Sequence, residues 1–286
     1  MPARVDIFFD TSIVSDRECD IRFLNFEAGI AGLPPAQALA WGFRCGKCGT
    51  HTSRTIMLEE LSHVLDATPG MASREDYADA VLEHNCLGKR TAATRKLSLQ
   101  RLTELYGLDA RVVLFRVLRD LWGRHETSRP LLALLLALAR DPLLRATARA
   151  VVTTPFGHEF ARQSMKDALS DAVGERLNDA TLDKVIRNAA SSWTQSGHLR
   201  GRGRKTRQRV EATPAAAAYA LLLGFAVGRR GRLLFQTPRV SVLDGSPDEI
   251  IDVSVGAKRL GLLDLKQSGS MIDVSFPTLF TERNGG

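Results

Sequence analysis

The sequence of 286 residues lacks any apolar run long enough to cross a membrane. The most apolar stretch, Leu131 to Ala139, is flanked by Arg129 and Arg140 and has nine residues, whereas a membrane-spanning helix needs about 20. Asp6 and Asp10 interrupt the start of the chain, which argues against a secretory signal peptide there. We therefore expect a cytoplasmic protein that makes no contact with a membrane and has a buried helix over residues 131–139.

Cysteine is scarce as well. The four cysteines are too few and too irregularly spaced for the disulfide framework of a small secreted protein. Cys45 and Cys48 have the spacing of half a zinc knuckle, but a structural zinc needs four ligands and no second pair stands at a suitable distance. We expect two free thiols in a glycine-containing turn, and no bound metal or other cofactor.

The common catalytic signatures are absent from the sequence. It contains no phosphate-binding loop, no dinucleotide-binding glycine motif and no H-E-x-x-H zinc motif. Ser192 and the serines near it have no evident histidine and aspartate partners. Asp248, Asp264 and Lys266 have an acceptable spacing for a metal-dependent nuclease, but Asp248 belongs to a helix-capping sequence rather than to a strand. We expect a protein that is not an enzyme, with the nuclease as an alternative.

Apolar residues at helical spacing predict a mainly α fold. Leu58, Leu61 and Leu65 fall on one face of a helix, and Pro130 and Pro142 each stand where a further helix can begin. The prediction is a helical N-terminal domain followed by winged-helix-like modules with small β-hairpins. The expected parts are an N-terminal arm (1–26), an all-helical domain (27–153), a winged-helix-like module with a basic wing (154–213) and a second module of helix and β-hairpin (214–286).

The two winged-helix-like modules are predicted from helices followed by short strands. In the first, residues 158–173 and 180–196 read as helices, and Gly197 is suited to end the second one in a left-handed conformation. In the second, residues 232–235 read as a strand. Ser246 begins a capping box with proline at the first helical position, and residues 262–266 and 271–276 alternate as a β-hairpin would.

Positive charge is concentrated in one part of the chain. The formal net charge is +7, with a pI of about 9.5. Residues 196–240 contain ten lysines and arginines against one acid, Glu211, which gives +9 in this segment alone. Such a local excess attracts polyanions.

The sequence predicts that this region binds double-stranded DNA. A helix over 180–196 carries on one face residue types that reach base edges and phosphates from the major groove, and the glycine-containing basic segment after it suits a wing lying on the sugar–phosphate backbone. The predicted contact residues of the helix are Lys184, Arg187, Asn188, Ser191 and Gln195. Those of the wing are His198, Arg200, Arg202, Arg204, Lys205, Arg207 and Arg209.

Three segments resemble the BrxA family, the small accessory proteins of BREX phage-defence systems. They are residues 87–91 (LGKRT), 105–109 (LYGLD) and 192–199 (SWTQSGHL), within a similarity that would cover about residues 25–280. The resemblance implies a largely helical protein with winged-helix parts that binds double-stranded DNA in antiviral defence. It also implies partners among the BREX methyltransferase, phosphatase-like protein and ATPase, and it brings no catalytic residues.

Two further alternatives stay open at this point. The basic segment could meet an acidic protein partner, in which case the chain would be an interaction scaffold within the defence complex. RNA is another candidate ligand, although the scarcity of aromatic residues around the basic segment counts against stacking on single strands.

Overall fold

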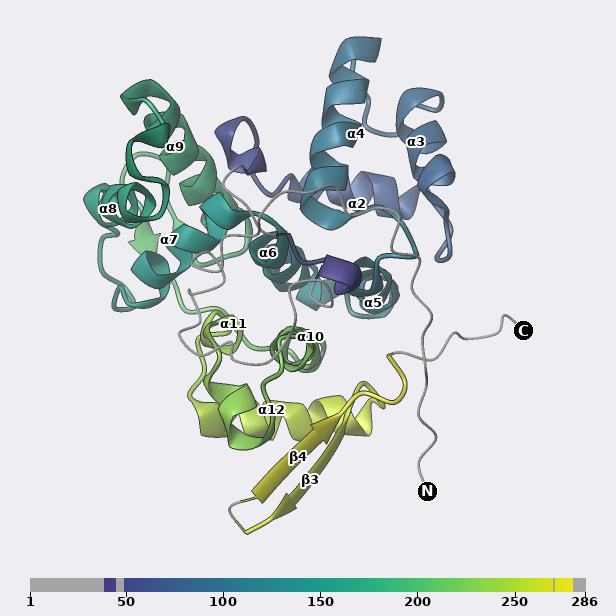
Figure 1. Cartoon of the computed structure of the whole chain (residues 1–286), viewed down its shortest axis with the longest axis vertical. Coiled ribbons are helices and arrows are strands. Elements are labelled where there is room, and N and C mark those ends of the chain that lie inside the picture. The colour runs from purple at the N-terminus through teal and green to yellow at the C-terminus, as the bar shows by residue number, and fades with distance from the viewer. Residues whose placement is uncertain (1–38, 45–48, 270, 280–286) are drawn as a thin grey trace.

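The computed structural model describes residues 39–44, 49–269 and 271–279. These residues form a mainly helical structure with two small antiparallel hairpins, which confirms the predicted fold class (Figure 1). The arm predicted over residues 1–26 lies outside the described residues. So does the turn that carries Cys45 and Cys48.

In the N-terminal helical region, α3 and α4 begin at residues whose side chains cap the helix. Ser73 and Asp76 form a reciprocal capping box at the start of α3, as the sequence suggests. Thr91 caps α4, and Gly107 ends it with a φ of 95°. The elements are η2 (Thr50–Thr52), α2 (Leu58–Asp66), α3 (Arg74–Leu82), α4 (Ala92–Tyr106), α5 (Val113–Arg124), η3 (Glu126–Ser128), α6 (Arg129–Arg140) and α7 (Pro142–Val152).

Helix α6 is the centre of this region. All of its residues from Leu131 to Ala139 are buried, as predicted for a core helix, and it packs against α4, α5, α7 and the later helix α10. Among the described residues, no helix combines the length and the apolar character needed to cross a bilayer.

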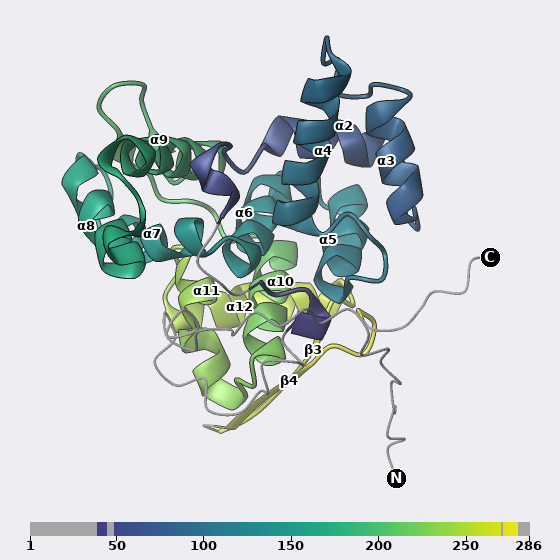
Figure 2. The same cartoon turned by 45° about the horizontal axis from the view of Figure 1, so that its top comes forward.

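The first winged-helix-like module follows on one side of the molecule, where α7, α8 and α9 lie together (Figure 2). The predicted helix over 158–173 is shorter than expected, because the backbone of residues 157–160 pairs with β2. Phe160 N donates to Lys205 O at 2.7 Å and Arg207 N donates to His158 O at 2.9 Å. The elements are α8 (Arg162–Val173), η4 (Gly174–Arg176), α9 (Asp179–Gln195), β1 (Leu199–Arg200) and β2 (Thr206–Arg207).

The order of these elements is that of a winged helix. Helix α7 is followed by Glu159, which forms an antiparallel bridge with Thr206, then by two helices and the hairpin β1–β2, in which Leu199 pairs with Arg207. Gly197 ends the module's last helix with a φ of 88°, as predicted. Gly201 turns the wing with a φ of 117°, and a Cβ there would lie 2.1 Å from Arg204 O, so only glycine fits.

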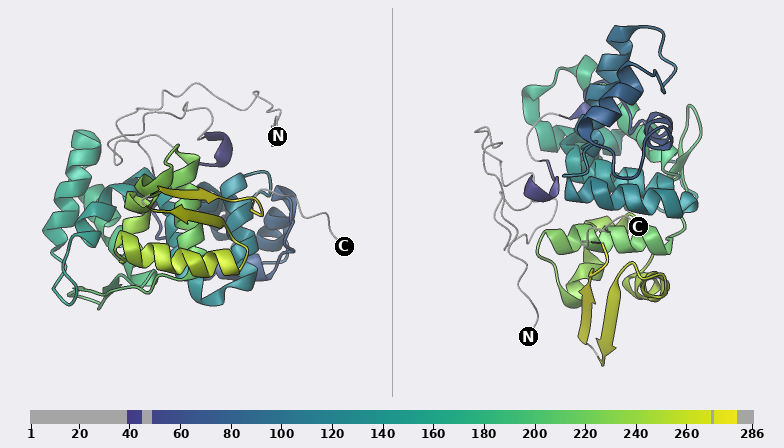
Figure 3. Two further views of the ribbon diagram at one scale, coloured as in Figure 1. Left: turned by 90° about the horizontal axis from the view of Figure 1, so that it is seen from below. Right: turned by 90° about the vertical axis from the view of Figure 1, so that its right-hand side faces the viewer.

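The second module also consists of helices followed by a β-hairpin, but one of its predicted strands is absent. Residues 232–235, expected to be a strand, lie within a 3-10 helix. The capping box of Ser246 with Glu249 and the β-hairpin are both confirmed, and the hairpin projects from α12 away from the N-terminal region (Figure 3). The elements are α10 (Pro214–Ala226), η5 (Gly231–Gln236), α11 (Pro238–Ser241), α12 (Pro247–Arg259), β3 (Asp264–Ser268) and β4 (Met271–Ser275).

Helix α10 joins the second module to the rest of the protein. Its residues from Ala215 to Gly224 are buried on every side, which is typical of a helix inside a core. Tyr219 Oη donates to Leu114 O of α5 at 2.9 Å. The modules and the N-terminal helical region therefore share one continuous hydrophobic core.

A buried ion pair fixes the base of the wing. The Arg207 side chain is fully buried, donates through Nε to Val151 O at 3.0 Å and pairs with the carboxylate of Asp244. Asp244 Oδ2 also accepts from Val210 N at 3.0 Å. Strand β2 is thereby tied both to α7 and to the loop between α11 and α12.

We expect Asp244→Asn to destabilise the protein by about 3–5 kcal/mol, because it leaves the Arg207 guanidinium buried without a counter-charge. Asp183→Asn is the matched control. It breaks an exposed ion pair with Arg162 and should change the free energy of unfolding by about 1 kcal/mol or less. Urea denaturation of the two variants measures the difference, and equal stabilities would contradict the structural role of the buried pair.

Candidate nucleic-acid interface

A basic cleft lies between α8, α9 and the wing. It has a volume of about 550 Å³ and is bounded by residues of α9, the start of α8 and the β1–β2 loop. One carboxylate, Glu159, lines it. The lining cations are Arg162, Arg187, Arg202, Arg204 and Lys205. With five cations against one acid, the cleft favours an anionic ligand.

Several cations in the cleft and beside it remain available to a ligand. In the part of the chain that the structure describes, no carboxylate lies within ion-pair distance of Lys184, Arg187, Arg200 or Arg202, and all four side chains are exposed. Arg204 pairs with Glu159 only at 3.9 Å, and its side chain is 88% exposed. Exposed pairs of this kind are weak, so phosphate groups can replace the carboxylate as partner.

Two residues that were predicted to contact DNA instead form hydrogen bonds within the protein. Asn188 Nδ2 donates to His51 O at 2.8 Å, and Gln195 Oε1 accepts from Leu58 N at 3.1 Å. Both lie on the side of α9 that faces the N-terminal helical region. Of the five predicted contact residues of this helix, Lys184, Arg187 and the half-buried Ser191 are left facing outward or lining the cleft.

His198 and Arg207 are also wrong as DNA contacts, because both side chains are fully buried. His198 packs edge-on against Trp193 with ring centroids 4.9 Å apart, and its Nε2 donates to Val242 O at 2.7 Å. Burial lowers the pKa of His198 to about 4, so it stays neutral near pH 7 and offers no charge to a phosphate.

Lys205 and Arg209 hold the wing in place. Lys205 Nζ donates to Thr194 Oγ1 of α9 at 2.8 Å and to Gly201 O at 3.0 Å, and partial burial lowers the pKa of this ammonium group. Arg209 pairs with Glu249 of α12 at 2.9 Å. The accessible wing cations are therefore Arg200, Arg202 and Arg204.

The charge of residues 196–240 is balanced in part by acids from elsewhere. Asp244 pairs with Arg207, Asp248 with Arg232 and Glu249 with Arg209. All three acids follow the segment in sequence and reach it only through the fold. These three acids reduce the excess of +9 counted along the chain to +6 in space. Four of the seven cations that are left lie on the wing: Arg200, Arg202, Arg204 and Lys205.

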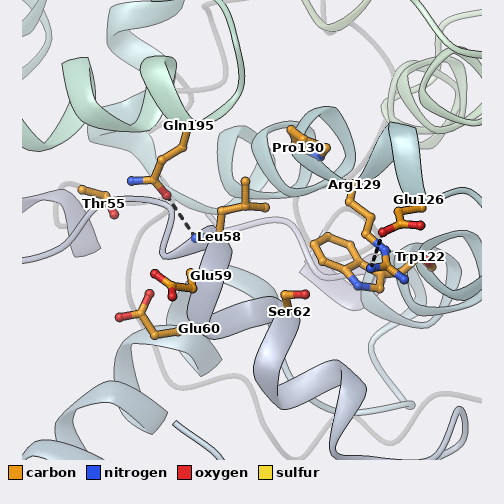
Figure 4. A pocket seen from close by; sticks show the side chains of 10 residues that line it. All are labelled: Thr55, Leu58, Glu59, Glu60, Ser62, Trp122, Glu126, Arg129, Pro130 and Gln195. Atoms are coloured by element: carbon orange, nitrogen blue, oxygen red, sulfur yellow. Dashed lines mark hydrogen bonds and ion pairs between the residues drawn. The ribbon is translucent and has the colours of Figure 1, made fainter. Parts of the chain in front are cut away.

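An acidic pocket of about 570 Å³ is formed by the start of α2, the end of α5, η3 and the start of α6, at the end of α9 (Figure 4). Glu59, Glu60 and Glu126 line it, and Gln195 reaches its edge with the hydrogen bond to Leu58 drawn in the figure. Carboxylates repel a sugar–phosphate backbone. This pocket therefore differs in sign from the basic cleft and does not suit a sugar–phosphate backbone.

A buried network of hydrogen bonds joins α9 to the N-terminal helical region. His51 Nδ1 lies 2.8 Å from Asp141 Oδ2, and His51 Nε2 lies 2.8 Å from Ser192 Oγ. This is the order of groups in a serine hydrolase triad. No sequence motif predicts this arrangement, because the three residues are separated by 90 and 51 positions along the chain.

The contacts of the network are structural. At most 2% of each of the three residues is exposed, so no substrate can reach Ser192. Its Oγ accepts from Ile56 N at 2.9 Å and lies 2.9 Å from Asn188 O as a donor. Asp141 caps α7 by accepting from Leu143 N and Leu144 N, and the neighbouring His51 together with these bonds lowers the pKa of this carboxyl.

The residues of the nuclease pattern do not meet. Asp248 pairs with Arg232 at 2.9 Å, whereas Asp264 pairs with Lys258 at 3.1 Å and with Lys266 at 3.8 Å. Asp248 and Lys258 are ten residues apart on α12, about 15 Å along the helix. The two carboxylates therefore cannot hold one metal ion together. The described residues contain no group of three or more potential metal ligands.

Known proteins add no family assignment. No protein-family model matches the chain, and no curated protein matches its sequence. The resemblance of residues 87–91, 105–109 and 192–199 to the BrxA family stays a prediction, and the basic cleft is the basis for inferring a function.

We expect Ser192→Ala to destabilise the protein by about 1–3 kcal/mol, because it leaves Ile56 N and the His51 ring without their buried partner. Ser191→Ala, one residue away on the cleft side, should stay within about 0.5 kcal/mol of the wild type. Wild-type protein should not react with a fluorophosphonate probe. Labelling of Ser192 would show that the network is catalytic after all.

Proposed function

We propose that this protein binds double-stranded DNA through the wing and the exposed side of α9, and does so without catalysing a reaction. The observation that carries the proposal is the basic cleft, in which a helix and a glycine-containing wing present cations toward the same space. The winged-helix order of α7 to β2 supports it, because that order places the last helix and the wing where a duplex can meet both.

Phosphate contacts supply most of the affinity in this proposal. Arg200, Arg202 and Arg204 on the wing neutralise successive phosphates, while Lys184 and Arg187 approach the groove from α9. Since Asn188 and Gln195 are engaged within the protein, few side chains remain to read base edges. We therefore expect weak sequence preference and strong dependence on salt.

The cellular role that we propose is that of a cytoplasmic accessory protein in bacterial antiviral defence of the BREX type. The resemblance of three segments to the BrxA family supports this part of the proposal. The methyltransferase, the phosphatase-like protein and the ATPase of such systems are the expected protein partners.

An interaction scaffold is the second candidate, and the acidic pocket of Figure 4 favours it. Three carboxylates line it, Glu59, Glu60 and Glu126, against one cation, Arg129. Glu60 pairs with Lys89 at 3.0 Å and Glu126 with Arg129 at 3.8 Å, but the excess of negative charge suits a basic segment of a partner protein. The scaffold predicts that Glu59→Gln with Glu126→Gln weakens complex formation with a defence component, whereas wing variants leave that complex intact.

The wing is tested with the double variant Arg202→Gln and Arg204→Gln. It should weaken duplex binding and reduce the slope of log K against log salt by about two, because each lost phosphate contact removes about 0.9. A mobility-shift titration over several salt concentrations measures both quantities, with single-stranded DNA and duplex RNA as competing ligands.

The double variant Arg90→Gln and Lys96→Gln is the matched control, since it removes the same charge from exposed positions beside and on α4. It should bind DNA like the wild type. If both double variants weaken DNA binding equally, the effect comes from net charge and not from the wing. If the protein does not bind DNA even at low salt, the interaction scaffold is the better explanation. Preferential binding of RNA would contradict the choice of duplex DNA.

A further inference from the structure

A second basic cavity lies apart from the wing. It has a volume of about 290 Å³ and is formed by α4, the end of α6, the start of α7 and the residues around η2. Arg44, Arg101 and Arg140 line it, and Glu104 is the one carboxylate among its lining residues. These three arginines come from three separate segments, so the fold and not a local run of charge brings them together.

The single carboxylate is already fully engaged. Glu104 Oε2 accepts from Thr50 Oγ1 at 2.9 Å and from Arg101 Nη1 at 2.7 Å, and its Oε1 accepts from Gln100 Nε2 at 3.1 Å. These hydrogen bonds lower the pKa of Glu104, which keeps it ionised. Against three guanidinium groups, one carboxylate leaves two positive charges in excess. Arg176 lines the cavity as well and brings no negative charge to it, so the excess is at least two.

Two of the guanidinium groups converge on one acceptor. Arg44 Nη1 donates to Glu104 O at 3.1 Å, and Arg140 Nε donates to the same oxygen at 3.2 Å. Arg140 also donates to Gly42 O and to Thr103 O, so its contacts are with carbonyls rather than a carboxylate. Burial and the charge of Arg44 lower the pKa of Arg140 to about 9. Like charges held this close are stabilised by an anion.

Donors remain for such an anion. A guanidinium carries five N–H groups, and within the described ranges Arg44 and Arg101 each use one of theirs.

We infer that this cavity binds a phosphate group. A phosphate monoester carries a charge of about −1.5 to −2 at pH 7, which matches the excess of two, and guanidinium groups bind phosphate oxygens in a fixed bidentate geometry. The cavity suits inorganic phosphate or the terminal phosphate of a nucleic acid, not the continuous backbone of a duplex. The site is separate from the wing, so it does not depend on the proposed function.

Calorimetric titration of the full chain with inorganic phosphate, at constant ionic strength in chloride, tests the inference. Wild-type protein should bind phosphate, and Arg44→Gln and Arg101→Gln should each weaken binding at least about tenfold, the loss expected for one charge-assisted hydrogen bond. Arg44 is exposed, so its variant should fold even if Arg101→Gln does not. The wing double variant Arg202→Gln and Arg204→Gln should bind phosphate like the wild type.

A short oligonucleotide with and without a 5′-phosphate distinguishes the two sources. Tighter binding of the phosphorylated form, lost in Arg44→Gln, assigns the site to nucleic-acid ends, whereas binding of inorganic phosphate alone assigns it to a free ligand. Either result supports the inference. It is overturned if wild-type protein binds neither probe, or if the wing variant loses phosphate binding as much as Arg44→Gln does.

Discussion

The hydrogen bonds that hold α9 against the N-terminal helical region decide which of its side chains can meet a ligand. Ser192 and Asn188 bond to the segment around His51, and Gln195 bonds to the start of α2. Because Asp141 both caps α7 and holds His51, the same network positions α7 as well as α9. The outer side of α9 is thereby left to the cleft, with a fixed orientation relative to the wing.

The wing depends on a second constraint, the pairing of its base with the α12 region. Arg207 is buried with Asp244, and Arg209 meets Glu249. The first contact removes Arg207 from the surface and the second neutralises the exposed Arg209. Both hold β2 and the residues after it in place, so the loop carrying Arg202 and Arg204 stands on an ordered base. The positive charges of Arg207 and Arg209 are thus unavailable to a ligand, but their ion pairs help to order the wing.

The sequence was sufficient for the fold class, for most helices and for the β-hairpin at the end, because apolar spacing and capping residues are local signals. The sequence wrongly predicted a helix for residues 158–161, which precede α8 and include the backbone that pairs with β2. It also wrongly predicted a strand for residues 232–235, which form part of the 3-10 helix η5. The prediction that Asn188 and Gln195 contact DNA was wrong for a similar reason. Only the fold shows that Asn188 faces the segment around His51, and a count of charge along the chain cannot include the acids near and on α12.

The central claim, that DNA meets the wing and the outer side of α9, is tested most directly by hydrogen–deuterium exchange with and without a duplex. The account predicts protection of the backbone amides in the wing, residues 200–206, and at the start of α8. Exchange in α2, beside the acidic pocket, should not change. Protection of α2 or of the β3–β4 hairpin, with an unaltered wing, would contradict it.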